Sequence, residues 1–153
     1  MIGESERFGT FRGQNFKLDL LKPVIAEDLI KLNSVFKRDA FSIRKLPTLH
    51  KLALCRIHGV LPLPGAAGRL EERVRLLRLV DEKLSTELSS SRGELGTHVL
   101  HYFLYLRHLP YDQMSREHMD KLLRSWLKLS KNKEVPLSLL AHAPILLQLS
   151  KLD

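Results

Sequence analysis

The chain has 153 residues and a mass of 17.6 kDa, enough for one domain, with or without an arm, around a substantial hydrophobic core. It carries 25 Lys and Arg against 17 Asp and Glu, and the resulting net charge of +8 favours polyanionic partners. Its single cysteine, Cys55, cannot form an internal disulfide, and no apolar run is long enough to span a membrane. We therefore expect an intracellular protein, with the nucleus favoured over an organelle.

The first half of the chain predicts an arm and then two helices. Residues 1–22 mix glycines with isolated phenylalanines and show no period, which predicts a flexible N-terminal arm. From Pro23 to about Phe36 the apolar residues recur at helical spacing, and this predicts the first helix. A basic connection follows over residues 37–45. Thr48 is a plausible start for the second helix, which Gly59 ends.

Residues 61–65 cannot be helical, because Pro62 and Pro64 lack amide hydrogens and disfavour helix in the residues before them. A third helix is predicted from about Ala66 to Leu88, with an apolar stripe on one face and arginines on the others. Three serines and two glycines in residues 89–96 predict a linker.

Three further helical segments are predicted after the linker. Residues 97–109 form one, which Pro110 stops. Ser115 has the properties of an N-cap for the next, whose apolar residues include Trp126 at core spacing. Residues 137–152 give one or two last apolar turns around Pro144. No segment alternates at period two, so the sequence predicts an all-α fold of five to six helices.

The predicted organisation has four parts: the arm at 1–22, a helical region at 23–88, the linker at 89–96, and a C-terminal helical hairpin at 97–153 packed on the first region. The two helix pairs share too little sequence to indicate a repeat.

An ordered motif lies in residues 54–74, and it consists of Leu54-Cys55-Arg56, Gly59-Val60, Gly65, Leu70 and Arg73-Val74. This order resembles the SAP-domain family over about residues 48–80. The resemblance implies a helix-turn-helix hairpin that binds DNA, and sometimes RNA, with the start of its second helix facing the phosphates. The family usually carries a lysine directly after the second glycine, where this chain has Ala66 and Ala67, and the turn here is one residue longer. Arg69 supplies a positive charge one turn later.

Taken with the net charge, the motif predicts a non-catalytic nucleic-acid-binding protein that contacts the phosphate backbone through a basic hairpin. The residues expected to make these contacts are Arg56, Arg69, Arg73 and Arg75, with Lys121, Arg124 and Lys128 as a second basic ridge on the Ser115 helix. The sequence does not separate DNA from RNA and gives no oligomeric state. A solvated helix surface is the simpler interpretation of the second ridge.

A second hypothesis belongs to a different class. High leucine content and the apolar segment at residues 137–152 are typical of a helical adaptor or assembly subunit in a larger protein or ribonucleoprotein complex. A peripheral membrane protein is a third interpretation, which rests only on the amphipathic Ser115 helix.

Catalysis, metal binding and cofactors have little support in the sequence. His98, His101 and His108 share a helix, but no carboxylate joins them and the HExxH arrangement is absent. We expect partly exposed helix histidines, a buried inert thiol at Cys55, and acidic residues that lie on the surface. The sequence therefore predicts no enzyme, no metal and no cofactor.

Overall fold

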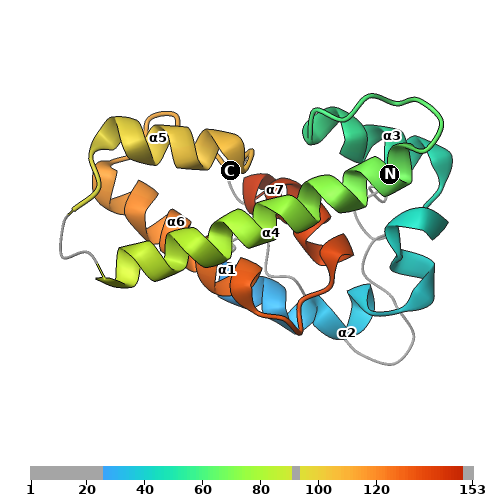
Figure 1. Ribbon diagram of the computed structural model, residues 1–153, viewed down its shortest axis with the longest axis horizontal. Helices are drawn as coiled ribbons and strands as arrows, with labels where there is room; N and C mark the ends of the chain where they lie inside the picture. Colours follow the sequence, from blue (N-terminus) through green and yellow to red (C-terminus); the bar gives the residue numbers. More distant parts are fainter. Residues whose placement is uncertain (1–25, 91–93, 150–153) are drawn as a thin grey trace, which may run out of the picture.

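The computed structural model describes residues 26–90 and 94–149, and every regular element in these two ranges is helical (Figure 1). The elements are α1 (Ala26–Leu29), η2 (Ile30–Leu32), α2 (Asn33–Phe36), η3 (Asp39–Phe41), η4 (Ile43–Lys45), α3 (Thr48–Ile57), α4 (Ala66–Ser90), α5 (Thr97–Leu106), α6 (Arg116–Lys131) and α7 (Leu137–Leu149), where η denotes a 3-10 turn. Counting α1, η2 and α2 as one continuous helix, the described residues form six helices. The prediction of an all-α fold is confirmed.

The first predicted helix is interrupted by a 3-10 turn, η2, and its Leu29 is buried where α1 packs against α6. The predicted basic connection at 37–45 instead contains two further 3-10 turns, η3 and η4. Ile43 and Leu46 are both buried, and their spacing of three residues suits a 3-10 turn, in which residues i and i+3 lie on one side. This segment therefore belongs to the core as well as to the surface.

Helix α3 ends as the sequence predicts, at Gly59. The glycine adopts a positive φ of 64°, the Val60 amide donates to the Cys55 carbonyl at 2.8 Å, and the Gly59 amide donates to the Arg56 carbonyl at 3.4 Å. This pair of bonds is the Schellman motif, which satisfies the last carbonyls of a helix and turns the chain away from its axis. Cys55 is buried, as expected.

Helix α4 is the longest element and crosses the whole molecule (Figure 1). Its buried stripe consists of Leu70, Val74, Asp81 and Leu84, at spacings that keep one face of a helix toward the core. This face packs against α6 and α7, and the first turns also contact α3 and η4. Leu70 and Val74, both members of the motif that resembles a SAP domain, are therefore core residues of the whole domain.

The C-terminal helices supply most of the core. Ser115 caps α6 as predicted, because its hydroxyl oxygen accepts the His118 amide at 3.2 Å. Trp126 is buried with the rest of the apolar face of α6. Residues predicted as one or two turns form the single helix α7, which includes Pro144 and packs against α1, α2 and α4.

The predicted domain division stays a prediction. The arm at 1–22 lies outside the described residues, as does part of the linker, residues 91–93. Ser89 and Ser90, which the sequence assigns to the linker, form the last residues of α4. No helix in the described part of the chain is both long and apolar enough to cross a membrane.

Candidate interaction surface

The basic ridge of α6 is exposed. Lys121, Arg124, Lys128 and Lys131 lie opposite the buried leucines and Trp126, because α6 concentrates its apolar residues on one face. Asp120 accepts a hydrogen bond from Arg124 Nε at 2.7 Å. Neither Lys121 nor Lys131 has an ion-pair partner among the described residues. With five basic and two acidic residues, α6 has a charge of 5 − 2 = +3.

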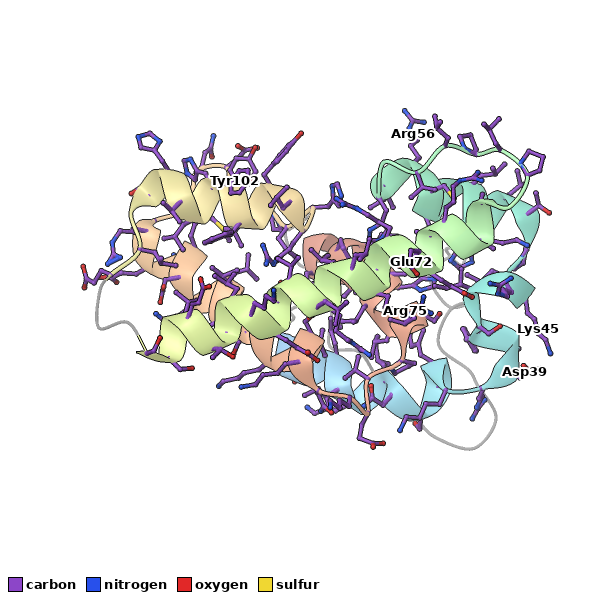
Figure 2. The ribbon with its side chains drawn as sticks, viewed as in Figure 1. Asp39, Lys45, Arg56, Glu72, Arg75 and Tyr102 are labelled. Atoms are coloured by element: carbon purple, nitrogen blue, oxygen red, sulfur yellow. The ribbon has the colours of Figure 1, made fainter. Side chains whose placement is uncertain are left out.

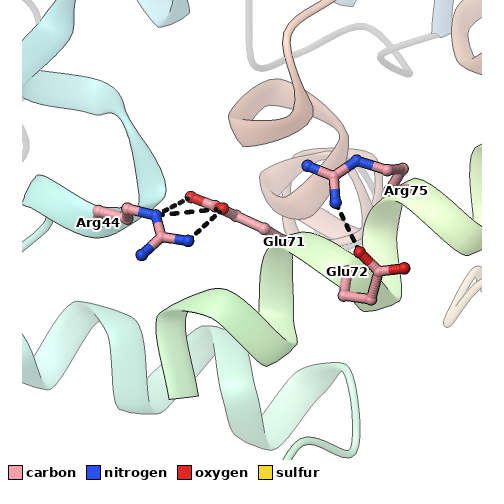
Figure 3. A network of polar contacts seen from close by, with 4 residues as sticks. All are labelled: Arg44, Glu71, Glu72 and Arg75. Carbon is pink, nitrogen blue, oxygen red and sulfur yellow. Dashed lines mark hydrogen bonds and ion pairs between the residues drawn. The ribbon is translucent and has the colours of Figure 1, made fainter. Parts of the chain in front are cut away.

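Helix α4 carries far less net charge than its arginines suggest. It contains five basic and five acidic residues, so its sum is 5 − 5 = 0. Figure 3 shows two of the pairs: Arg44 of η4 binds the Glu71 carboxylate through Nε and Nη2, both at 3.1 Å, and Arg75 binds Glu72 at 2.6 Å. Arg75, a predicted contact residue, is thus paired within its own helix.

Arg69 has a structural role in the connection between α3 and α4. Its Nη1 donates to the Pro64 carbonyl, and its Nη2 donates to the Leu61 and Leu63 carbonyls, all at 2.9 Å. Gly65 has a φ of 83°, and a Cβ there would lie 3.4 Å from the Arg69 guanidinium. Arg69 therefore stabilises the turn between α3 and α4, and most of its hydrogen-bond donors are already in use. The sequence did not predict this role, although an arginine one turn after a Pro-rich connection is a signal for it.

Arg56 and Arg73 are exposed and have no ion-pair partner in the described ranges. Arg56 lies at the outer edge of α3 (Figure 2), and the charge of Arg73 acts on two histidines. The predicted contact residues do not form one footprint. Helices α4 and α6 turn their buried faces toward each other, so the α6 ridge and the arginines of α3 and α4 lie on different sides of the molecule.

Two histidines whose rings are in contact are influenced by the charge of Arg73. The rings of His58 and His108 are 5.5 Å apart, and His58 Nε2 donates to the Ala141 carbonyl of α7 at 2.8 Å. Burial lowers the pKa of His58; its hydrogen bond to Ala141 raises it, and the charge of Arg73 lowers it further. The pKa of His108 is also lowered, chiefly by burial and then by His58 and Arg73.

A second histidine pair connects α3 to α7. His142 Nδ1 lies 2.6 Å from the Ser138 carbonyl, which only accepts, so Nδ1 carries the hydrogen. Nε2 of His142 lies 2.7 Å from Nε2 of His50, and neutral His142 accepts there. Burial lowers the pKa of His142, and the hydrogen bond to Ser138 opposes that effect. Among the described residues, no group of three or more His, Cys, Asp or Glu side chains is placed to hold a metal ion.

The main buried polar cluster joins three helices. Asp81 of α4 accepts hydrogen bonds from Arg107 Nε at 2.8 Å and from Trp126 Nε1 at 2.8 Å. Arg107 also donates to the Phe103 carbonyl at 2.7 Å, and its guanidinium lies 5.5 Å from the centre of the Phe103 ring. All three polar partners are buried. The expectation that acidic residues lie on the surface is wrong for Asp81, whose place in the apolar stripe of α4 was the available signal.

These features define an all-helical domain with an exposed basic ridge on α6. Residues 13–147 match the family described as LETM1-like, RBD, where RBD denotes a ribosome-binding domain. The chain belongs to this family, since the match covers nearly all of it. No curated protein and no solved structure matches the chain.

The resemblance to SAP domains is wrong, because one match to a different family extends from residue 13 into α7. The structure gives the physical reason. The leucines of the pattern, Leu54 and Leu70, are core residues, Gly59 ends α3, and Gly65 lies in the connection to α4. Arg69, which supplies the positive charge in place of the family's lysine, binds carbonyls of that connection. Nucleic-acid binding by a SAP-like hairpin, and DNA binding with it, is likewise contradicted.

Localisation also needs correction. The LETM1 family is mitochondrial, so the family gives no support for the nucleus, whereas the organelle alternative agrees with it. The family implies a ribonucleoprotein partner. This agrees with the predicted nucleic-acid partner only in that a ribosome contains RNA. The absence of catalysis stays a prediction.

Proposed function

We propose that this chain is a non-catalytic helical adaptor that docks on a ribosome in mitochondria. The observation that carries the proposal is the family match over residues 13–147, which includes every described helix apart from the last residues of α7. An assembled ribosome presents RNA phosphates on its surface, and a domain with an exposed basic ridge suits such a particle. The second hypothesis from the sequence, an assembly subunit, is closer to this function than the first.

The α6 ridge is the surface that we assign to the electrostatic part of docking. Lys121 and Lys131 are exposed on the face opposite the core, and α6 has a charge of +3. Cations on one side of a rigid helix contact phosphates without reading sequence, and each contact makes binding sensitive to salt. The predicted residues Arg124 and Lys128 lie on the same face and extend the ridge.

The test is binding to mitochondrial ribosomes over a salt series, with a Lys121→Glu/Lys131→Glu double variant. If both lysines contact phosphates, the variant should bind more weakly, and the slope of log affinity against log salt should fall by about 2, one for each lysine. An Arg38→Glu/Lys83→Glu variant changes as many exposed charges away from α6 and should behave as wild type. Equal losses of affinity in the two variants would show a general charge effect and would contradict the assignment of the α6 ridge to docking.

A further inference from the structure

A different surface lies at the end of the molecule formed by α3 and the connection to α4 (Figure 1). Four leucines there are exposed: Leu49 by 81%, Leu52 by 38%, Leu61 by 68% and Leu63 by 58%. Single exposed leucines are ordinary, but a cluster within a short stretch of chain is typical of a contact surface. The α6 ridge, which we assign to the ribosome, does not include it.

The connection that carries Leu61 and Leu63 is held in one conformation. Pro62 and Pro64 restrict its backbone, and Arg69 binds three of its carbonyls at 2.9 Å. The Leu63 carbonyl also accepts the Ala66 amide at 3.0 Å. A surface that is ordered before binding loses less conformational entropy when a partner docks. The connection thus presents two leucines to solvent on a fixed backbone.

The charge of this end is positive and largely uncompensated. Residues 40–70 contain five basic residues and no Asp or Glu. Arg44 and Lys45 are paired with Glu71 and Asp39. Within the described residues no ion pair neutralises the others, which are Lys51, Arg56 and Arg69, or the neighbouring Arg73. A complementary partner therefore carries carboxylates or phosphates beside its apolar contacts.

The apolar side chains favour a protein over RNA. Surfaces that bind single-stranded bases use aromatic side chains as stacking platforms, and residues 42–101 contain no Phe, Tyr or Trp. Exposed leucines instead pack into the apolar face of an amphipathic helix, which a partner helix presents at i, i+3, i+4 and i+7. Acidic residues beside that face would meet Arg56 and Arg73.

We propose that α3 and the connection from α3 to α4, which Arg69 stabilises, form a docking surface for an acidic amphipathic helix of a partner protein. Leu49, Leu52, Leu61 and Leu63 supply the apolar contacts, and Arg56 and Arg73 supply the charge complementarity. This surface extends the adaptor function, because it lets the chain hold a protein while α6 contacts the ribosome. It does not depend on ribosome binding.

The experiment uses the full chain and a labelled synthetic helix built from Leu and Glu, with its leucines on one face, in fluorescence anisotropy. The control peptide has the same composition in scrambled order. We expect saturable binding of the amphipathic peptide and a loss of about tenfold or more in a Leu61→Ser/Leu63→Ser variant. Leu76 and Leu79 are exposed by 50% and 52% on α4, so Leu76→Ser/Leu79→Ser is the matched control and should bind as wild type.

Charge is tested separately with Arg56→Glu/Arg73→Glu, which should weaken binding of the acidic peptide and reduce its salt dependence. Circular dichroism melting curves show whether each variant is folded. The proposal is overturned if the scrambled peptide binds equally, or if the α4 control loses as much affinity as the loop variant. It is also overturned if the amphipathic peptide does not bind. In that case, binding of single-stranded RNA or anionic phosphatidylserine vesicles that is lost in Leu61→Ser/Leu63→Ser would identify the occupant instead. None of these experiments contains ribosomes. A negative result therefore does not affect the proposal for the α6 ridge, which is tested separately.

Discussion

At the scale of single residues, Asp81 is the most consequential polar side chain in the core. Its two carboxylate oxygens are shared between Arg107, the residue directly after α5, and Trp126 of α6, and all three side chains are buried. A buried ion pair adds little net stability by itself, but removing one partner leaves an uncompensated charge in the interior. Asp81 thus fixes how three helices meet.

Replacing Asp81 by Ala should lower the free energy of unfolding by about 3–5 kcal/mol, because Arg107 would stay buried without its carboxylate. Urea denaturation followed by circular dichroism measures the loss. Glu87→Ala, at an exposed position of the same helix, is the control and should change stability little. An Asp81→Ala variant as stable as the control would mean that the cluster contributes nothing.

The sequence shows which residues of this cluster are unusual but not how they pair. Asp81 falls in the apolar stripe of α4, and Trp126 falls on the apolar face of α6, where burial was predicted and is confirmed. Arg107 lies 26 residues and Trp126 lies 45 residues from Asp81 in the chain. Side-chain periodicity within one helix carries no information about contacts over such separations. For the same reason, the pairing of Arg44 with Glu71 could not be predicted.

At the scale of elements, Arg69 is expected to hold the connection between α3 and α4. An Arg69→Gln variant loses most of the three carbonyl bonds, while α4 keeps its packing against α6 and α7. The amides of Leu63 and Ala66 should then exchange with deuterium faster, and amides in the middle of α4 should not. Unchanged exchange at residues 61–66 would show that the prolines alone fix the turn.

The cap of α6 gives a second prediction at this scale. Ser115 satisfies one of the free amides at the helix start, that of His118, and replacing a serine cap by Ala costs about 1 kcal/mol. Ser115→Ala should lower the urea midpoint by the corresponding amount, and Ser115→Asp should restore it because Asp is an equally good cap. Failure of Asp to restore stability would indicate that the Ser115 hydroxyl acts in another way.

Helix boundaries were predictable where local chemistry sets them. Thr48, Ala66, Thr97 and Ser115 mark starts that the structure reproduces to within a residue, because caps, prolines and glycines act over a few residues. The 3-10 turns η2, η3 and η4 were not predicted. They are short, and their formation depends on burying Leu29, Ile43 and Leu46 against helices that are distant in sequence.

At the scale of the whole molecule, the buried histidines couple stability to pH. His58 and His142 connect α3 to α7, and His108 lies beside His58. Burial lowers the pKa of each below 6.5, the ordinary value for histidine, so the folded protein holds them neutral where the unfolded chain is protonated. The unfolded state then binds more protons as pH falls, and stability decreases.

We therefore expect full stability from these groups above pH 6.5, a progressive loss as pH falls below that value, and no further loss beneath the folded-state pKa values. Urea midpoints measured between pH 8 and pH 5 test this. His58→Gln retains a donor for the Ala141 carbonyl and should make the pH dependence shallower, whereas His98→Gln on the exposed side of α5 should not. A midpoint that is constant across this range would contradict the assignment.

The whole-molecule level is also where inference from sequence succeeded least. The all-α class follows from helical periodicity in every long segment. The function did not follow, because a basic composition and a short motif describe many unrelated proteins, and the arginines of α4 are balanced by five acidic residues of the same helix. The family match extends over residues 13–147 and so depends on the sequence of nearly the whole chain, which no single short motif contains.

The central claim is that this chain docks on an assembled ribosome. The most direct measurement is sedimentation of the purified full chain with intact mitochondrial ribosomes, in parallel with the same ribosomal RNA after removal of its proteins, at physiological salt. We predict saturable sedimentation with intact ribosomes and far weaker binding to the deproteinised RNA. A chain that stays in the supernatant with ribosomes, or that binds the deproteinised RNA equally well, would contradict the claim.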